Sequence, residues 1–307
     1  MTCLTPLNIG TQSVACGRCE ACLVRRSNEW AFRLFQELEV SKNAYFVTLT
    51  YDELNVPRGE VPVYIRTHRL SSDELRSPFA DKIRAKREPI LEHYRLYGEW
   101  PIKRYIHNAM TFSSRDVQLF IKRLRKQMPP GFRFFLCAEY GAENERPHYH
   151  AIFFNMSDLS KEPNINMDKL EDLVRRTWNK GRIDIQKVSN ANLIYTCKYS
   201  LSSMDYPRDM PIPFIRASKG LGMNYVANED NVNYHIDNLS GICTLSDGSK
   251  FPLPRYYKRK MFDADTRQLY NEKCERELTE YTDAEKEHYR YKIRKNFKKS
   301  RKNIDND

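Results

Sequence analysis

The stretch Arg146-Pro147-His148-Tyr149-His150, followed at once by Ala151-Ile152-Phe153-Phe154, decides how the centre of this chain folds. The run of apolar residues predicts a buried β-strand. Side chains two positions apart on a strand point to the same face, about 7 Å apart. His148 and His150 therefore present two imidazoles side by side, while Tyr149 points away. Such a pair suits a divalent metal ion, although two solvated or hydrogen-bonded histidines at a strand start give the same pattern.

A second apolar strand is predicted just upstream, over Phe132–Ala138, and the turn-like stretch 140–145 leads from it to the histidine strand. Two strands joined in this way favour an antiparallel hairpin. In that hairpin Glu139, at the end of the first strand, lies close to His148 at the start of the second. The hairpin thus offers a carboxylate as a third candidate metal ligand.

Apolar periodicity predicts further elements on both sides of this hairpin. A serine, Ser113 or Ser114, is a suitable N-cap for the helix before the hairpin, and the region 54–110 is a Pro-rich, charged insertion. The other predicted elements are a helix at Ser27–Val40, a strand at Ala44–Tyr51, a helix at Met167–Trp178, a strand at Arg182–Ile185 and a helix at Asn190–Ser200.

The composition indicates a nucleic-acid partner. The 307 residues carry a formal net charge of +11, and the 19 tyrosines supply rings on which single-stranded bases can stack. Between His288 and Lys302 there are eight Lys or Arg and no acid, so this tail is predicted to be a frayed or disordered helix that touches phosphate backbone. The sequence shows no apolar run of transmembrane length and no signal peptide, so we expect a soluble intracellular protein.

Four of the eight cysteines cluster near the N-terminus. Cys16, Cys19 and Cys22 follow one another at intervals of three, and Cys3 offers a fourth thiolate. Disulfides are not expected without a signal peptide. Tetrahedral zinc is the natural candidate, because thiolates close structural zinc sites. An iron–sulfur cluster, or reduced cysteines without a ligand, are the alternatives.

Two tyrosines share one face of the predicted helix at 190–200, because Tyr195 and Tyr199 are four residues apart. Lys198 lies between them in the sequence. These tyrosines either pack against a sheet with their hydroxyls at its rim or serve as nucleophiles. Thr48 and Thr50 share one face of the predicted strand at 44–51 and are candidates to line the same site.

In this order the motifs resemble the replication initiators of the HUH endonuclease superfamily, and more closely the rolling-circle initiators (Rep proteins) of the Microviridae, especially of gokushovirus-like phages. The long segment 54–110 and Cys197, inside the tyrosine motif, depart from the family pattern. The matching segments are 46–52 (first motif), 139–150 (metal motif with its upstream acid), 195–199 (tyrosine motif), 16–22 with 30–33 (cysteine-rich start) and 254–258, which has no assigned role.

The resemblance implies an α+β fold, with a central antiparallel sheet, the histidines on a middle strand and helices packed on one face. The corresponding domain is expected at residues 27–215, with the insertion at 54–110. Residues 1–26 would form a Cys-rich zinc module, and residues 216–307 a C-terminal region with the basic tail.

The implied activity is that of a site-specific single-stranded DNA endonuclease and strand transferase. A tyrosine would attack the viral origin to leave a 5′-phosphotyrosine link and a free 3′-OH, which host polymerase and helicase would use in the cytoplasm of the bacterial host. The carboxylate favours Mg²⁺ or Mn²⁺ over zinc at this site. The resemblance assigns metal binding to His148, His150 and Glu139, catalysis to Tyr195, Tyr199 and Lys198, and DNA contact to Thr48, Thr50 and Arg146.

Two other interpretations stay open. A zinc-dependent nucleic-acid-binding protein without catalysis accounts for the cysteines and the charge, but it leaves Tyr195 and Tyr199 unexplained. A relaxase or transposase of the same superfamily would use similar motifs, and the paired tyrosines favour replication over a one-tyrosine transposase.

Overall fold

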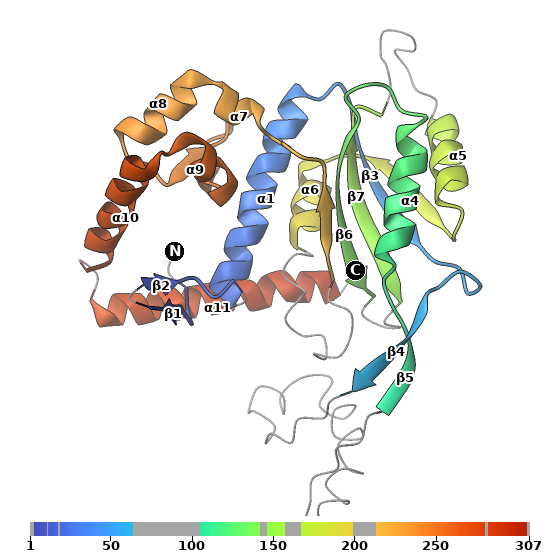
Figure 1. Cartoon of the computed structure of the whole chain (residues 1–307), viewed down its shortest axis with the longest axis horizontal. Helices are drawn as coiled ribbons and strands as arrows, with labels where there is room; N and C mark the ends of the chain where they lie inside the picture. The colour runs from blue at the N-terminus through green and yellow to red at the C-terminus, as the bar shows by residue number, and fades with distance from the viewer. Residues whose placement is uncertain are drawn as a thin grey trace, which may run out of the picture. The chain divides into compact units, whose positions relative to one another are not determined.

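A five-stranded antiparallel sheet, in the order β8-β3-β7-β6-β9, holds the histidine strand at its centre (Figure 1). The computed structural model describes residues 3–10, 12–17, 19–63, 105–141, 146–156, 167–198, 213–279 and 282–305. The strands of the sheet are β3 (Ala44–Thr50), β6 (Arg133–Tyr140), β7 (Pro147–Phe154), β8 (Ile183–Lys187) and β9 (Ile215–Ala217).

The register of the sheet sets which side chains can meet. Strand β7 pairs with β6 so that Glu139 lies opposite His148, as the predicted hairpin requires. On its other side β7 pairs with β3, where Thr50 lies opposite His148 and Thr48 lies opposite His150. Directly opposed residues of an antiparallel pair share a face, so all five side chains lie on one face of the sheet.

Helices cover both faces of the sheet. Helices α1 (Glu20–Val40) and α6 (Asn190–Lys198) pack against the histidine face, around Ile152 and Phe154. Helices α4 (Ser114–Arg125) and α5 (Met167–Trp178) lie on the opposite face, where Phe120 meets Phe153 and Trp178 (Figure 1). The α+β class with a central antiparallel sheet is confirmed, but the expectation of helices on one face is wrong, because β7 is apolar on both faces and both need cover.

Most of the predicted elements of the sheet domain appear close to their expected ends. The hydroxyl of Ser113 accepts a hydrogen bond from the backbone N–H of Asp116 (3.0 Å) and so caps α4. Helix α1 begins at Glu20, seven residues before the predicted start at Ser27, because the cysteine segment leads directly into it. Helix α6 is described as far as Lys198, and the rest of its predicted range lies outside the described residues.

The C-terminal region builds a second apolar core on α1, around Phe32, Tyr225 and Tyr257. Helix α1 therefore belongs to two cores, one on each side. The C-terminal elements are α7 (Asn224–Ala227), α8 (Glu229–Asp237), β10 (Ile242–Thr244), β11 (Lys250–Pro252), α9 (Arg255–Met261), α10 (Ala264–Thr279) and α11 (Asp283–Asp305). The basic tail, expected to be frayed or disordered, is the helix α11.

Residues 57–111 and 206–212 form a second compact unit, and the remainder of the chain forms the first. Of this second unit the structure describes β4 (Arg58–Val63), which pairs antiparallel with β5 (Tyr105–Met110). The three-part division at residues 26 and 215 stays a prediction. Among the described residues, no helix is both long and apolar enough to cross a membrane.

His235 in the C-terminal core gives a pH-dependent prediction. Its Nε2 is 2.9 Å from the Tyr225 hydroxyl and its Nδ1 is 2.8 Å from the Ser240 carbonyl. Burial, aided by the nearby charge of Lys258, lowers the pKa of His235 below 6.5. The unfolded chain then takes up this proton more readily than the folded chain, so stability is present above about pH 6.5 and is lost as the pH falls.

We therefore expect the urea midpoint of the wild type to drop between about pH 7 and pH 5, and His235→Gln to lose part of that drop. The matched control is His288→Gln, because His288 is exposed on α11. Urea denaturation of the three proteins at both pH values checks this, and an unchanged pH dependence in His235→Gln would contradict it.

Candidate functional site

The two histidines of β7 lie side by side, with their ring planes 5° apart and their centroids 6.5 Å apart. The ring of His150 stacks on Phe46, and its Nδ1 is 3.2 Å from the hydroxyl of Thr48. The Nδ1 of His148 is 2.6 Å from the backbone carbonyl of Arg146. A carbonyl only accepts, so this Nδ1 carries the hydrogen and Nε2 keeps its lone pair. Both rings are thus held by neighbours on the same face.

The carboxylate of Glu139 lies against His150, with Oε2 3.3 Å from Nε2. Burial lowers the pKa of His150 to about 4 and also lowers the pKa of His148 below 6.5. Both imidazoles are therefore neutral near pH 7, which is the form that binds metal ions.

The three predicted ligands are neighbours, but they do not form a ready ligand group in the positions they occupy. Within the described ranges, the only set of three or more His, Cys, Asp or Glu whose ligand atoms all lie within 4.8 Å of one another is the cysteine group below. An ion bound by His148, His150 and Glu139 together requires side-chain rotation to bring their ligand atoms closer. The donor set, two neutral nitrogens and a carboxylate, fits a divalent cation.

Helix α6 brings Tyr195 to the same place. Its ring lies edge-on to His150, with centroids 6.2 Å apart. The helix is anchored there because Leu193 and Cys197 are fully buried against the sheet. Lys198 is the last described residue of α6, and Tyr199 lies outside the described residues. The structure thus places one of the two predicted tyrosines beside the histidines.

A cavity of about 650 Å³ adjoins the histidines along β3 and β8. It offers hydroxyls, carboxylates and guanidinium groups, a mixture that suits the polar parts of a nucleotide. Arg146 is held at its mouth by the Tyr51 carbonyl (2.9 Å) and by the Glu53 carboxylate. The lining residues used in the argument are Thr48, Thr50, Arg146, His148, Arg182 and Asp184.

Arg182 and Asp184 are site residues that the sequence analysis did not single out. Asp184 lies opposite Thr48 in the β3–β8 pairing, and the carbonyl of Arg182 accepts hydrogen bonds from Thr50. Their alternation with Ile183 on a predicted strand was the available signal, but the partner strand of β8 could not be predicted from it.

Gly141, directly after β6, leaves room for the ring of His148. A Cβ at this position would lie 2.9 Å from Cε1 and 3.3 Å from Nδ1 of His148, so the ring would have to shift. We expect Gly141→Ala to weaken Mn²⁺ binding about 10-fold, the size of loss typical when the support of a metal ligand is disturbed. Calorimetric titration with Mn²⁺ measures the effect.

The control for this prediction is Gly248→Ala. Gly248 has a φ of +82° in the β10–β11 turn, where a side chain is strained but no atom lies within 4 Å of the added Cβ. This variant should lose stability and keep its Mn²⁺ affinity. An unchanged affinity in Gly141→Ala would show that His148 does not need the space.

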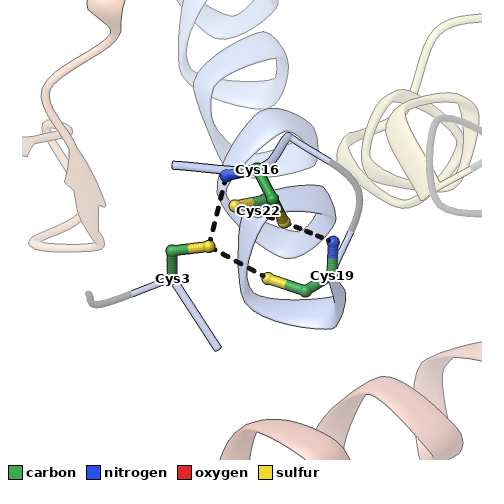
Figure 2. A group of neighbouring side chains, drawn as sticks. All are labelled: Cys3, Cys16, Cys19 and Cys22. Carbon is green, nitrogen blue, oxygen red and sulfur yellow. Dashed lines mark hydrogen bonds between the residues drawn. The ribbon is translucent and has the colours of Figure 1, made fainter. Parts of the chain in front are cut away.

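The four N-terminal cysteines converge on one point (Figure 2). The sulfur of Cys3 is 3.7 Å from that of Cys19, and the sulfur of Cys16 is 4.0 Å from that of Cys22. Tetrahedral zinc, with Zn–S bonds of about 2.3 Å, places its sulfurs about 3.8 Å apart. The predicted cluster is therefore present with dimensions that can hold a metal ion.

Hydrogen bonds around the cluster favour thiolates. The backbone N–H groups of Leu4, Cys16 and Cys19 each donate to a cysteine sulfur at 3.3 Å. Burial raises the pKa of the Cys22 thiol to about 12, so this sulfur is protonated near pH 7 unless a cation holds it as a thiolate.

Residues 103–204, which include β6, β7 and α6, match the sequence model of a family of replication-associated proteins of the ORF2 type. Two phage proteins are similar to most of the chain. The replication-associated protein ORF2 of Spiroplasma virus 4 is 26% identical over 270 residues, which cover 82% of this chain and 69% of that protein. The replication-associated protein VP4 of Bdellovibrio phage phiMH2K is 23% identical over 262 residues, which cover 79% and 65%. The predicted resemblance to replication proteins of small phages is confirmed.

Among solved structures, the N-terminal nuclease domain of the minute virus of mice non-structural protein 1 matches 66% of this chain and 82% of that domain. The sequence identity is 8% and the TM-score is 0.20. A similarity this low carries no argument about the fold or the activity.

Proposed function

We propose that this protein initiates rolling-circle replication of a small single-stranded DNA phage, by nicking the origin with a tyrosine and later rejoining the ends. The observation that carries the proposal is the position of Tyr195 against His150, on the face where His150 also meets Glu139. These residues lie inside the region that matches the family of replication-associated proteins.

In the proposed reaction, Oη of Tyr195 or Tyr199 attacks the phosphorus in line and its phenolic proton passes to solvent. The bond from phosphorus to the 3′ oxygen breaks, and that oxygen takes up a proton to become a free 3′-OH. The new phosphotyrosine bond keeps the energy of the broken ester, so a 3′-OH can later attack it and restore the strand without ATP. Lys198, between the tyrosines in sequence, would steady the negative charge on the phosphate oxygens.

The histidine site would hold a divalent ion, Mg²⁺ or Mn²⁺, between His148, His150 and Glu139. Such an ion supplies polarisation of the phosphate oxygens, which a phenol with a pKa of about 10 needs for attack near neutral pH. The neutral imidazoles and the adjacent carboxylate support this assignment.

Single-stranded origin DNA would enter along the cavity beside β3 and β8. Thr48 and Thr50 present hydroxyls there, and Arg146 presents a guanidinium group at its mouth. After the first cut, a polymerase and a helicase of the bacterial host would extend the 3′-OH in the host cytoplasm.

A second candidate is a nucleic-acid-binding protein that depends on zinc and has no catalysis. It is favoured by one observation: within the described residues, the four cysteines are the only group already arranged to hold an ion. It leaves the position of Tyr195 without a role.

One experiment separates the two candidates. The full chain is incubated with Mn²⁺ and a randomised single-stranded oligonucleotide library labelled at its 3′ end. Nicking attaches the 3′ fragment to the protein, so a slowly migrating, protease-sensitive band is expected, and it should vanish when EDTA replaces Mn²⁺. Binding without any such band would support the second candidate, and free cleaved ends without attached protein would indicate hydrolysis by water instead of tyrosine attack.

A further inference from the structure

Helix α11 is attached to the cysteine cluster by two apolar side chains. Ile293 and Phe297 are one turn apart, and only 7% and 6% of their surfaces are exposed. Ile293 packs in one cluster with Cys19 and Cys22, and Phe297 packs against Leu23 at the start of α1. Figure 1 shows α11 running across this end of α1, next to the short strands β1 (Leu7–Ile9) and β2 (Gln12–Val14).

The rest of this part of α11 faces solvent and is basic. Lys292, Arg294 and Lys295 are exposed around the buried Ile293. No acid occurs between His288 and Lys302. Two apolar contacts thus fix a helix whose remaining surface suits a polyanion, and DNA is the polyanion that the proposed function supplies.

The surface that receives Ile293 depends on the cysteines. The residues before α1 form a hairpin of two three-residue strands, and all three residues of β1 are exposed. A segment with so little apolar burial does not hold its own shape, and small modules of this kind fold when their metal binds. A metal-loaded cluster is also negative, because four thiolates outweigh one divalent ion, and this charge attracts a basic helix.

From these contacts we infer that α11 is a second DNA-binding surface, which grips the phosphate backbone, and that a metal ion on Cys3, Cys16, Cys19 and Cys22 holds it in place. Metal at the cysteines would therefore control affinity for DNA separately from the histidine site. The inference rests on the DNA-binding part of the proposed function and does not require nicking.

The first test removes the charges of α11. DNA binding is measured by fluorescence anisotropy at several salt concentrations, in full-length protein carrying Tyr195→Phe and Tyr199→Phe so that no strand is cut. Lys292→Gln, Arg294→Gln and Lys295→Gln together should lower the slope of log affinity against log salt by about 2, because each lost contact to single-stranded DNA removes about 0.7.

The matched control is the set Lys122→Gln, Arg125→Gln and Lys126→Gln, which removes the same charge from exposed positions at the end of α4 on the other face of the sheet. It should leave the slope within error of the parent protein. An unchanged slope in the α11 set, or equal changes in both sets, would overturn the inference.

The second test breaks the link to the metal. Cys16→Ser with Cys19→Ser should lose its metal and show the same lowered slope as the α11 charge set, and combining the two sets should add nothing further. Ile293→Ala with Phe297→Ala should keep the metal and also lower the slope, so it remains informative if the cysteine variant fails to fold. A metal-free variant with the parent slope, or a wild-type slope in the Ile293 and Phe297 variant, would refute control by the metal.

The nicking assay of the wild type separates this inference from the proposed reaction. Loss of the salt-slope effect with normal nicking would reject α11 as a DNA-binding surface and leave the proposed function standing. A salt-slope effect without any nicking would reject the reaction and leave the DNA-binding surface standing.

Discussion

Replacing both Tyr195 and Tyr199 with phenylalanine is expected to abolish the covalent protein–DNA band, with a loss of at least about 10³-fold in the rate of adduct formation. Each change removes one hydroxyl and keeps the ring, so the contact of residue 195 with His150 and the packing of α6 should survive. The readout is the protease-sensitive band described above, with circular dichroism to show that the fold is retained.

The single variants assign the order of the two cuts. If one tyrosine makes the first cut and the other receives the second, one single variant should form no adduct, and the other should form an adduct that is not resolved into a closed circle. The control is Tyr234→Phe, which removes a hydroxyl from an exposed tyrosine of α8. Wild-type adduct levels in the double variant would mean that another nucleophile is at work.

Replacing Cys16 and Cys19 with serine is expected to remove one zinc ion per chain and to destabilise the N-terminal segment by at least about 5 kcal/mol. The apparent free energy of zinc binding in small Cys-rich modules is about 10–16 kcal/mol, and most of it is folding free energy. Elemental analysis measures the metal, and chemical denaturation followed at Trp30 in α1 measures the stability.

The control for the zinc prediction is Cys274→Ser, because Cys274 lies outside the four-cysteine group. It should retain its metal. Full zinc content in the Cys16 and Cys19 variant would contradict the assignment, and iron in place of zinc in the wild type would favour the iron–sulfur alternative.

The centre of the site could be predicted from the sequence because its information is local. A turn between two apolar strands was enough to place Glu139 opposite His148, and the structure confirms that pairing. The side chain of Glu139 nevertheless reaches His150, because a long carboxylate side chain can bridge to the next residue on the same face. Backbone register follows from pattern, whereas the contact of a flexible side chain depends on its neighbours in space.

The remaining features depend on contacts between distant parts of the chain. Strand β9 has three residues and pairs with β6 about 80 residues earlier, so no local pattern announces it. The docking of α11 rests on Ile293 and Phe297 within a run of charges, too few apolar positions to form a recognisable stripe. Helix α1 starts early because small and sulfur-containing residues carry little periodic signal.

The double role of α1 has a consequence for any attempt to isolate the catalytic half of the chain. Glu37 on this helix pairs with Arg133 of the sheet and accepts a hydrogen bond from the backbone of Gly222, while Phe32 is fully buried against Tyr225 and Tyr257. A chain cut at residue 215 would expose that apolar side to water and orphan a buried carboxylate contact. The C-terminal third is thus an inseparable part of the same folding unit, and soluble fragments of this protein should be sought by trimming elsewhere.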